Sequence, residues 1–83
     1  MYILVNNERL ISFSEITQIS FDDYGVYCRF SGENTAYMVL GQYAGDENKR
    51  VFERITDWIV TNSLADKGID SYKYKAIFRM PDC

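Results

Sequence analysis

The residue types that carry most enzyme chemistry are sparse in this sequence. Histidine is absent, which excludes Ser-His-Asp and Cys-His catalysis, the usual zinc sites and an imidazole pH switch. Cys28 stands in a strand-like segment and Cys83 is the last residue. The two form no CxxC unit, so we expect reduced thiols. The sequence therefore predicts a protein that is not an enzyme and needs no cofactor.

Other polar residues with possible chemistry are interpreted as structural. Asp22 and Asp23 could bind a hard cation, but neighbouring strand residues point to opposite faces and no third ligand is spaced nearby. We therefore predict a turn and no metal site. Gly41 and Gly45 could place backbone N–H groups around a phosphate at a helix start. Because the P-loop lysine is missing, an ordinary strand-to-helix loop is the preferred interpretation.

The first half of the chain predicts an antiparallel sheet. Turn residues such as Asn6-Asn7 and Gly25 separate short segments of strand-like pattern, at 2–5, 10–13, 16–22, 26–31 and 35–40. Connections this short favour antiparallel neighbours. The expected fold class is α+β, with an antiparallel β-meander of about five strands in a single domain over 1–83.

An amphipathic helix is predicted over 46–66. Asp46 is a suitable N-cap, and Lys67-Gly68 is a suitable terminus. Apolar side chains recur every three or four residues and form one stripe: Val51, Ile55, Trp58 and Ile59, with Phe52 at its margin. We expect this helix to pack across one face of the sheet.

The clearest alternation in the chain lies over 72–80. One predicted face carries Tyr72, Tyr74, Ala76, Phe78 and Met80, and the other carries Lys73, Lys75, Ile77 and Arg79. A C-terminal strand is expected here, with its first face buried and its end at Pro81.

Composition and charge limit the possible partners. With 47% hydrophobic and 16% aromatic residues, 83 residues suffice for one core. Twelve acidic and nine basic residues give a net charge of −3, which provides no overall attraction to long nucleic acids or anionic membranes. No apolar run approaches the roughly 18 residues of a membrane-spanning helix, and Asn6-Asn7 interrupt the first apolar segment before it resembles a signal peptide. We expect a cytoplasmic protein.

The sheet is larger than one helix can cover. A helix of about 20 residues covers one face of about three strands, so we expect an uncovered face. If Val26, Cys28, Phe30, Ala36, Met38 and Leu40 face the helix, the uncovered face carries Tyr27, Arg29, Tyr37 and Val39. Together with Lys73, Lys75 and Arg79, these are the candidate ligand-binding or interface residues. Three interpretations stay open: tyrosines with solvated hydroxyls, a protein interface, or a site for an anionic, ring-bearing ligand.

Four segments also resemble a known group of proteins. They are Ile3-Leu4-Val5-Asn6-Asn7, Leu40-Gly41-Gln42-Tyr43, the helix over 46–60 and Ile77-Phe78-Arg79-Met80-Pro81. Their order resembles that in small, largely uncharacterised proteins of Firmicutes and their prophages. In that group a Gly-x-Tyr motif precedes the helix and a Phe-x-x-Pro strand closes the chain. The stretch from Asn62 to Ser71 is longer here. The resemblance implies a phage or mobile-element accessory protein, carries over no catalytic residue and favours an anti-defence role.

From these features we expect a non-enzymatic binding protein of the phage anti-defence type, which sequesters a small anionic, nucleotide-like ligand. Because so small a chain can hardly enclose a nucleotide, the expected pocket is shared between subunits of a homo-oligomer. The alternative is a protein-binding inhibitor or adaptor that contacts a host or defence protein through the uncovered sheet face. A small enzyme with a tyrosine or carboxylate base is a third interpretation, which no residue spacing supports.

Overall fold

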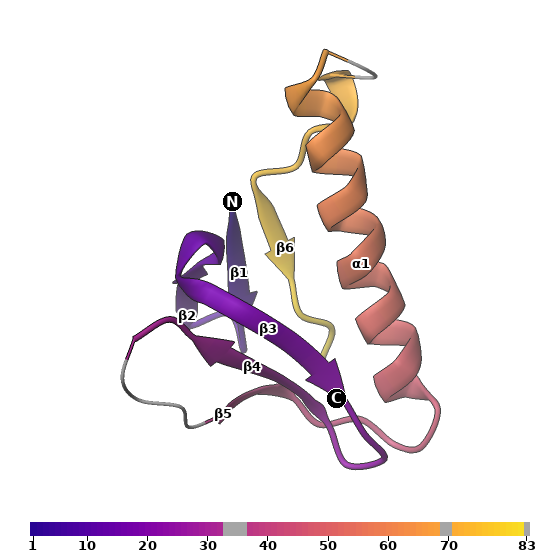
Figure 1. Ribbon diagram of the computed structural model, residues 1–83. Helices are drawn as coiled ribbons and strands as arrows, with labels where there is room; N and C mark the ends of the chain where they lie inside the picture. Colours follow the sequence, from indigo (N-terminus) through magenta and orange to yellow (C-terminus); the bar gives the residue numbers. More distant parts are fainter. Residues whose placement is uncertain (33–36, 69–70, 83) are drawn as a thin grey trace.

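The computed structural model describes residues 1–32, 37–68 and 71–82, and it confirms the α+β class (Figure 1). In chain order, the elements are β1 (Tyr2–Val5), β2 (Arg9–Ser12), the 3-10 helix η1 (Phe13–Glu15), β3 (Ile16–Phe21), β4 (Val26–Phe30), β5 (Tyr37–Gly41), α1 (Glu47–Asp66), the 3-10 helix η2 (Ser71–Lys73) and β6 (Ile77–Arg79). In the part of the chain that the structure describes, no helix combines the length and apolar character needed to cross a membrane.

The strands form two sheets, where the alternation suggested one continuous meander. One sheet has the order β2-β1-β6 and the other the order β3-β4-β5. The short helix η1 follows β2 directly and separates it from β3, so the antiparallel pairing is interrupted there. Strand β6 pairs with β1 in parallel, with Ile3 opposite Phe78, and lies between β1 and α1 (Figure 1). A parallel neighbour requires a long crossover, and α1 with the chain that follows it supplies one.

The turns follow the predicted chemistry. Asn6 and Asn7 between β1 and β2 have φ values of 54° and 57°, in the left-handed region that asparagine tolerates. Between β3 and β4, Asp22 Oδ1 accepts the backbone N–H groups of Tyr24 at 2.8 Å and Gly25 at 3.1 Å. The pair at 22–23 therefore forms part of a side-chain-stabilised turn, as interpreted from the sequence.

The hydrophobic core lies between the two sheets and α1. The helix packs against β3 and β4 and presents the predicted stripe, with Val51 and Ile55 each 1% exposed and Trp58 7% exposed. The strands contribute the remaining buried core residues: Ile3, Val5, Ile11, Val26, Cys28, Leu40 and, beyond β6, Met80. Burial of this apolar surface is the main source of stability. Ala36, which was predicted for the same face, lies outside the described residues.

The start of α1 differs from the prediction. Asp46 has helical backbone angles and its side chain makes no capping hydrogen bond. Asn48, which is fully buried, stabilises the preceding loop: its Oδ1 accepts the N–H of Tyr43 at 3.1 Å, and its Nδ2 donates to the carbonyl oxygens of Tyr43 at 3.0 Å and Gly45 at 3.3 Å. The same Nδ2 also donates to the carbonyl oxygen of Asp23, in the turn between β3 and β4, at 3.2 Å. An amide can accept and donate at once, whereas a carboxylate only accepts. The predicted end of the helix is confirmed, with Gly68 at φ 82°.

The C-terminal strand is shorter than predicted. β6 covers only Ile77–Arg79, and η2 occupies Ser71–Lys73. Tyr72 is 79% exposed and Tyr74 43% exposed, and Ala76 is also exposed, so the prediction that these residues share a buried face with Phe78 and Met80 is wrong. The cause is a tertiary contact: side chains of α1 bind the backbone of Lys75, which takes the place of strand pairing before residue 76.

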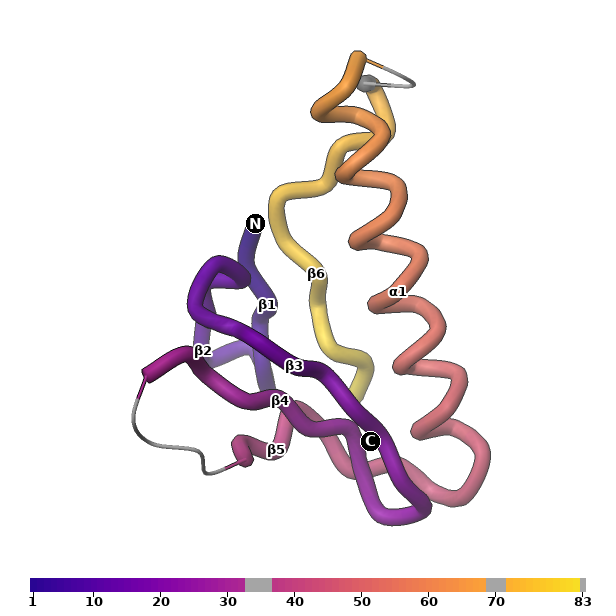
Figure 2. The backbone as a smooth tube through the Cα atoms, viewed as in Figure 1, coloured from indigo at the N-terminus to yellow at the C-terminus, as the bar shows by residue number. Residues whose placement is uncertain are grey.

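One tyrosine connects the helix start to the end of the chain. Tyr43 Oη donates to the carbonyl oxygen of Pro81 at 2.6 Å, and its ring lies directly over Gly41, where an added Cβ would come within 2.5 Å of Tyr43 Oη. Figure 2 shows the chain leaving β6 and running toward the N-terminal end of α1. The Gly-x-Tyr and Phe-x-x-Pro segments noted in the sequence therefore meet in space.

Candidate functional site

The predicted uncovered face is the outer face of the β3-β4-β5 sheet. Tyr27 pairs with Val39 across β4 and β5, and Arg29 pairs with Tyr37. Tyr37 is 50% exposed and Val39 44% exposed, whereas Val26 and Cys28, on the opposite face, are fully buried. The alternation along β4 therefore places the four candidates on the face away from the core.

Arg29 and the tyrosines of this face form a connected cluster. The Arg29 guanidinium carbon lies 4.2 Å from the centroid of the Tyr37 ring, a cation–π arrangement. The rings of Tyr27 and Tyr37 meet edge to face at 6.4 Å. Within the described ranges, Arg29 Nε is the single buried side-chain nitrogen or oxygen without a hydrogen-bond partner. A buried polar group without a partner costs free energy.

A shallow cavity of about 310 Å³ lies at one end of the same face, lined by Ser20, Phe21, Asp22, Tyr27 and Tyr37. Tyr27 Oη donates to Asp22 Oδ1 at 3.1 Å. Partial burial and the adjacent Asp22 carboxylate raise the pKa of the Tyr27 phenol above its ordinary value. Tyr27 therefore stays protonated at neutral pH and is a poor general base.

The basic candidates lie in a different place, along a groove between α1 and the chain leading into β6. The groove has a volume of about 410 Å³ and is lined by Asp57, Trp58, Thr61, Asn62, Lys73, Lys75, Ile77, Phe78 and Arg79. Three cationic side chains face one carboxylate there, so this part of an acidic protein carries a local excess of positive charge. In the described part of the chain, no salt bridge involves Lys75 or Arg79.

Two aromatic side chains line the groove, and hydrogen bonds from α1 fix the chain segment at its edge. The rings of Trp58 and Phe78 lie 5.5 Å apart. Lys75 is fixed by α1: its carbonyl oxygen accepts Trp58 Nε1 and Asn62 Nδ2, both at 2.7 Å, and its N–H donates to Asn62 Oδ1 at 3.0 Å. Asn62 is fully buried, so its two bonds form in a low-dielectric environment where they are strong.

The seven candidates thus form two sites. Tyr27, Arg29, Tyr37 and Val39 share the outer sheet face, while Lys73, Lys75 and Arg79 line the groove beside α1. The sequence patterns did not indicate that Trp58, Asn62 and Phe78 line the same groove as the lysines. The available signal was the polar Asn62 at the end of the apolar helix stripe, since a buried amide must bind something.

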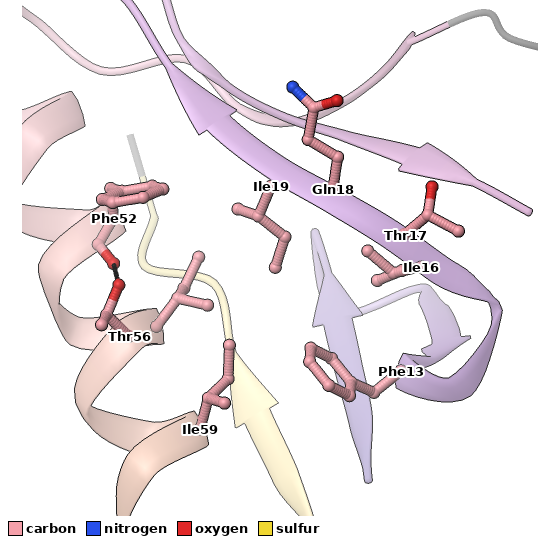
Figure 3. A pocket seen from close by; sticks show the side chains of 9 residues that line it. Phe13, Ile16, Thr17, Gln18, Ile19, Phe52, Thr56 and Ile59 are labelled. Atoms are coloured by element: carbon pink, nitrogen blue, oxygen red, sulfur yellow. Dashed lines mark hydrogen bonds between the residues drawn. The ribbon is translucent and has the colours of Figure 1, made fainter.

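A third, apolar groove of about 250 Å³ lies between β3 and α1. Figure 3 shows Phe13, Ile16 and Ile19 on one side and Phe52 and Ile59 on the other. Ile16 and Ile19 reach the same face although they are three residues apart, because the pairing with β4 shifts between Ile16 and Gln18. No charged side chain lines this groove, so it is unsuited to an anion.

Among the described residues, no group of three or more acidic or cysteine side chains could hold a metal ion. Cys28 is fully buried, and this burial raises the pKa of its thiol, which leaves it neutral and unreactive. Comparison with protein-family models, with curated proteins and with solved structures found no match for this chain.

Proposed function

We propose that the protein is a non-enzymatic binding protein that holds a small anionic ligand in the groove between α1 and β6. One observation carries the proposal: Lys73, Lys75 and Arg79, which the sequence pattern selected, line a single groove. Arginine offers a planar donor fork and lysine a mobile point charge, and both suit phosphate or carboxylate oxygens.

A nucleotide-like ligand fits the composition of the groove best. Its phosphate would lie against Lys75 and Arg79, and its base would lie on the apolar surface that Phe78 and Trp58 provide. The volume of about 410 Å³ falls in the range of roughly 300–1,000 Å³ that small-molecule sites occupy. The groove is open to solvent, so a ligand bound by one chain would remain partly exposed.

Binding without chemical change is the simplest outcome for such a groove. Among the residues that the structure describes, Asp57 is the one carboxylate of the groove, and no serine or cysteine side chain lines it, so its lining offers no paired nucleophile and base. The resemblance to prophage proteins leads us to propose sequestration of a nucleotide signal used in host defence as the biological role.

The proposal is tested by titration calorimetry with adenosine monophosphate, a cyclic dinucleotide and inorganic phosphate. We expect a nucleotide to bind with a Kd of about 10 μM or lower, and Lys75→Gln and Arg79→Gln each to weaken it at least about tenfold. Arg54→Gln is the matched control, because Arg54 is exposed on α1 and does not line the groove.

Unchanged affinity in both groove variants would refute this site. Ligand recovered after heat denaturation should have its original mass, whereas an altered mass would indicate an enzyme.

The alternative function, a protein-binding inhibitor or adaptor, is favoured by the exposed Tyr37 and Val39 on the outer sheet face. It predicts no affinity for any nucleotide and loss of partner binding in a Tyr37→Ala variant. The nucleotide titration therefore distinguishes the two functions directly.

A further inference from the structure

The outer face of the β3-β4-β5 sheet has opposite charges at its two ends. Its residues form three successive levels along the strands: Asp22 at the turn, then Ser20, Tyr27 and Val39, then Gln18, Arg29 and Tyr37. Same-face residues of a strand are about 6.8 Å apart, so the Asp22 and Arg29 levels are separated by roughly 13 Å. Between them lie aromatic and aliphatic side chains.

Such a face is complementary to itself. If a second copy lies over the first, related by a two-fold axis that passes near the Tyr27 and Val39 level, each Arg29 lies opposite the partner's Asp22. The exposed side chain of Val39 is then buried near the axis, and that of Tyr37 is buried beside Arg29. Two-fold contacts between identical surfaces are the commonest form of protein oligomer.

The unpartnered groups of the face suit this arrangement. The Arg29 guanidinium lies over the half-exposed Tyr37 ring, and the Asp22 hydrogen bonds to Tyr24, Gly25 and Tyr27 all use Oδ1. A second carboxylate oxygen thus remains at the edge of the face, and it can accept from a guanidinium. In the described part of the face, Asp22 and Arg29 are the only charged side chains.

We propose that this face is the interface of a homodimer in which Arg29 of each copy pairs with Asp22 of the other. This interface is independent of the groove beside α1. A failure of the dimer therefore leaves the proposed ligand site intact, and a failure of ligand binding leaves the dimer intact.

Sedimentation velocity between about 1 μM and 1 mM protein tests the proposal. We expect the wild-type chain to reach twice the mass of one chain, and Arg29→Gln and Asp22→Asn each to raise the dimer Kd at least about tenfold. Asp22→Asn keeps the Oδ1 acceptor that the turn needs, so it removes charge without removing the turn. Arg54→Gln removes a positive charge from α1 and should leave the dimer unchanged.

A variant that combines Arg29→Gln and Asp22→Asn tests whether these two residues contact each other across the interface. If Arg29 and the partner's Asp22 contact each other, combining the two substitutions raises the Kd no further than the more severe single change. A wild-type chain that stays monomeric at about 1 mM, a dimer unaffected by both variants, or effects that add fully would overturn the proposal. If the wild-type chain is monomeric, the outer sheet face remains exposed and available to a different protein.

Discussion

The Asn62 side chain pairs with the backbone of Lys75 as a neighbouring strand would. Its Nδ2 donates to the Lys75 carbonyl at 2.7 Å, and its Oδ1 accepts the Lys75 N–H at 3.0 Å. This pair fixes the chain that carries the basic side chains of the groove against α1, and it explains why the strand pattern over 72–75 does not form a strand.

Replacement of Asn62 by leucine should lower the free energy of unfolding by about 2–3 kcal/mol, because both hydrogen bonds of the buried Asn62 amide to the Lys75 backbone are lost. Urea denaturation measures the change. Ser63→Ala, at the next and exposed position of α1, should alter stability by less than about 0.5 kcal/mol. Equal stability of the Asn62 variant and the wild-type protein would contradict the assigned role of the pair.

Asn48→Ala should destabilise the protein by about 3 kcal/mol, since three hydrogen bonds to the loop between β5 and α1 and one to the turn between β3 and β4 are lost. For a domain of this size, that corresponds to a melting temperature lower by more than about 10 °C. Thermal unfolding followed by circular dichroism provides the measurement. Lys49→Ala, at the exposed neighbouring position, is the control and should melt close to the wild-type temperature.

Gly41→Ala should displace the Tyr43 ring, because the new Cβ would lie 2.5 Å from Tyr43 Oη. The hydrogen bond from Tyr43 to Pro81 would break with it, so a cost of about 2–4 kcal/mol is expected from overpacking and the lost bond together. Tyr43→Phe removes the hydroxyl alone and should cost only about 1 kcal/mol. If the two variants are equally stable by urea denaturation, the ring does not pack on Gly41 as described.

Cys28 should make stability fall as the solution becomes alkaline. Burial raises the pKa of its thiol above the ordinary value of 9.0. The stability that the neutral thiol provides is therefore complete below that value and is lost as pH rises through the higher folded pKa. Urea midpoints at pH 7, 8, 9 and 10 should decline less steeply for Cys28→Ala than for the wild-type protein.

A reactivity assay offers a second check. In a Cys83→Ser background, the Cys28 thiol should resist a disulfide reagent in the folded protein and react rapidly in urea. Rapid reaction of the folded protein would mean that Cys28 is accessible, contrary to its complete burial.

Local patterns predicted much of this fold. The apolar spacing in 46–66 identified α1 and its buried side, because a helix stripe depends only on neighbouring positions. The alternation along β4 likewise identified the face with Tyr27 and Arg29. The division into two sheets was not visible, since each strand pairs through long-range contacts that alternation does not specify.

The groove beside α1 could be predicted only in part. The alternation of Lys73, Lys75 and Arg79 grouped the cations correctly, but it placed Tyr72 and Tyr74 in the core. The misplaced tyrosines and the groove residues that the pattern missed have the same cause. Trp58 and Asn62 form tertiary hydrogen bonds to the backbone at Lys75. No local rule links residues 13 or 17 positions apart.

The most direct test of a ligand site between α1 and β6 is an amide NMR titration of the ¹⁵N-labelled protein with adenosine monophosphate. The sequence contains one tryptophan, so the indole N–H of Trp58 gives a single, assignable signal inside the groove. We expect this signal and the amides of Lys75, Phe78 and Arg79 to shift together with one Kd, while the amides of Tyr27 and Tyr37 do not shift. Shifts confined to the outer sheet face, or none anywhere, would contradict a ligand site between α1 and β6.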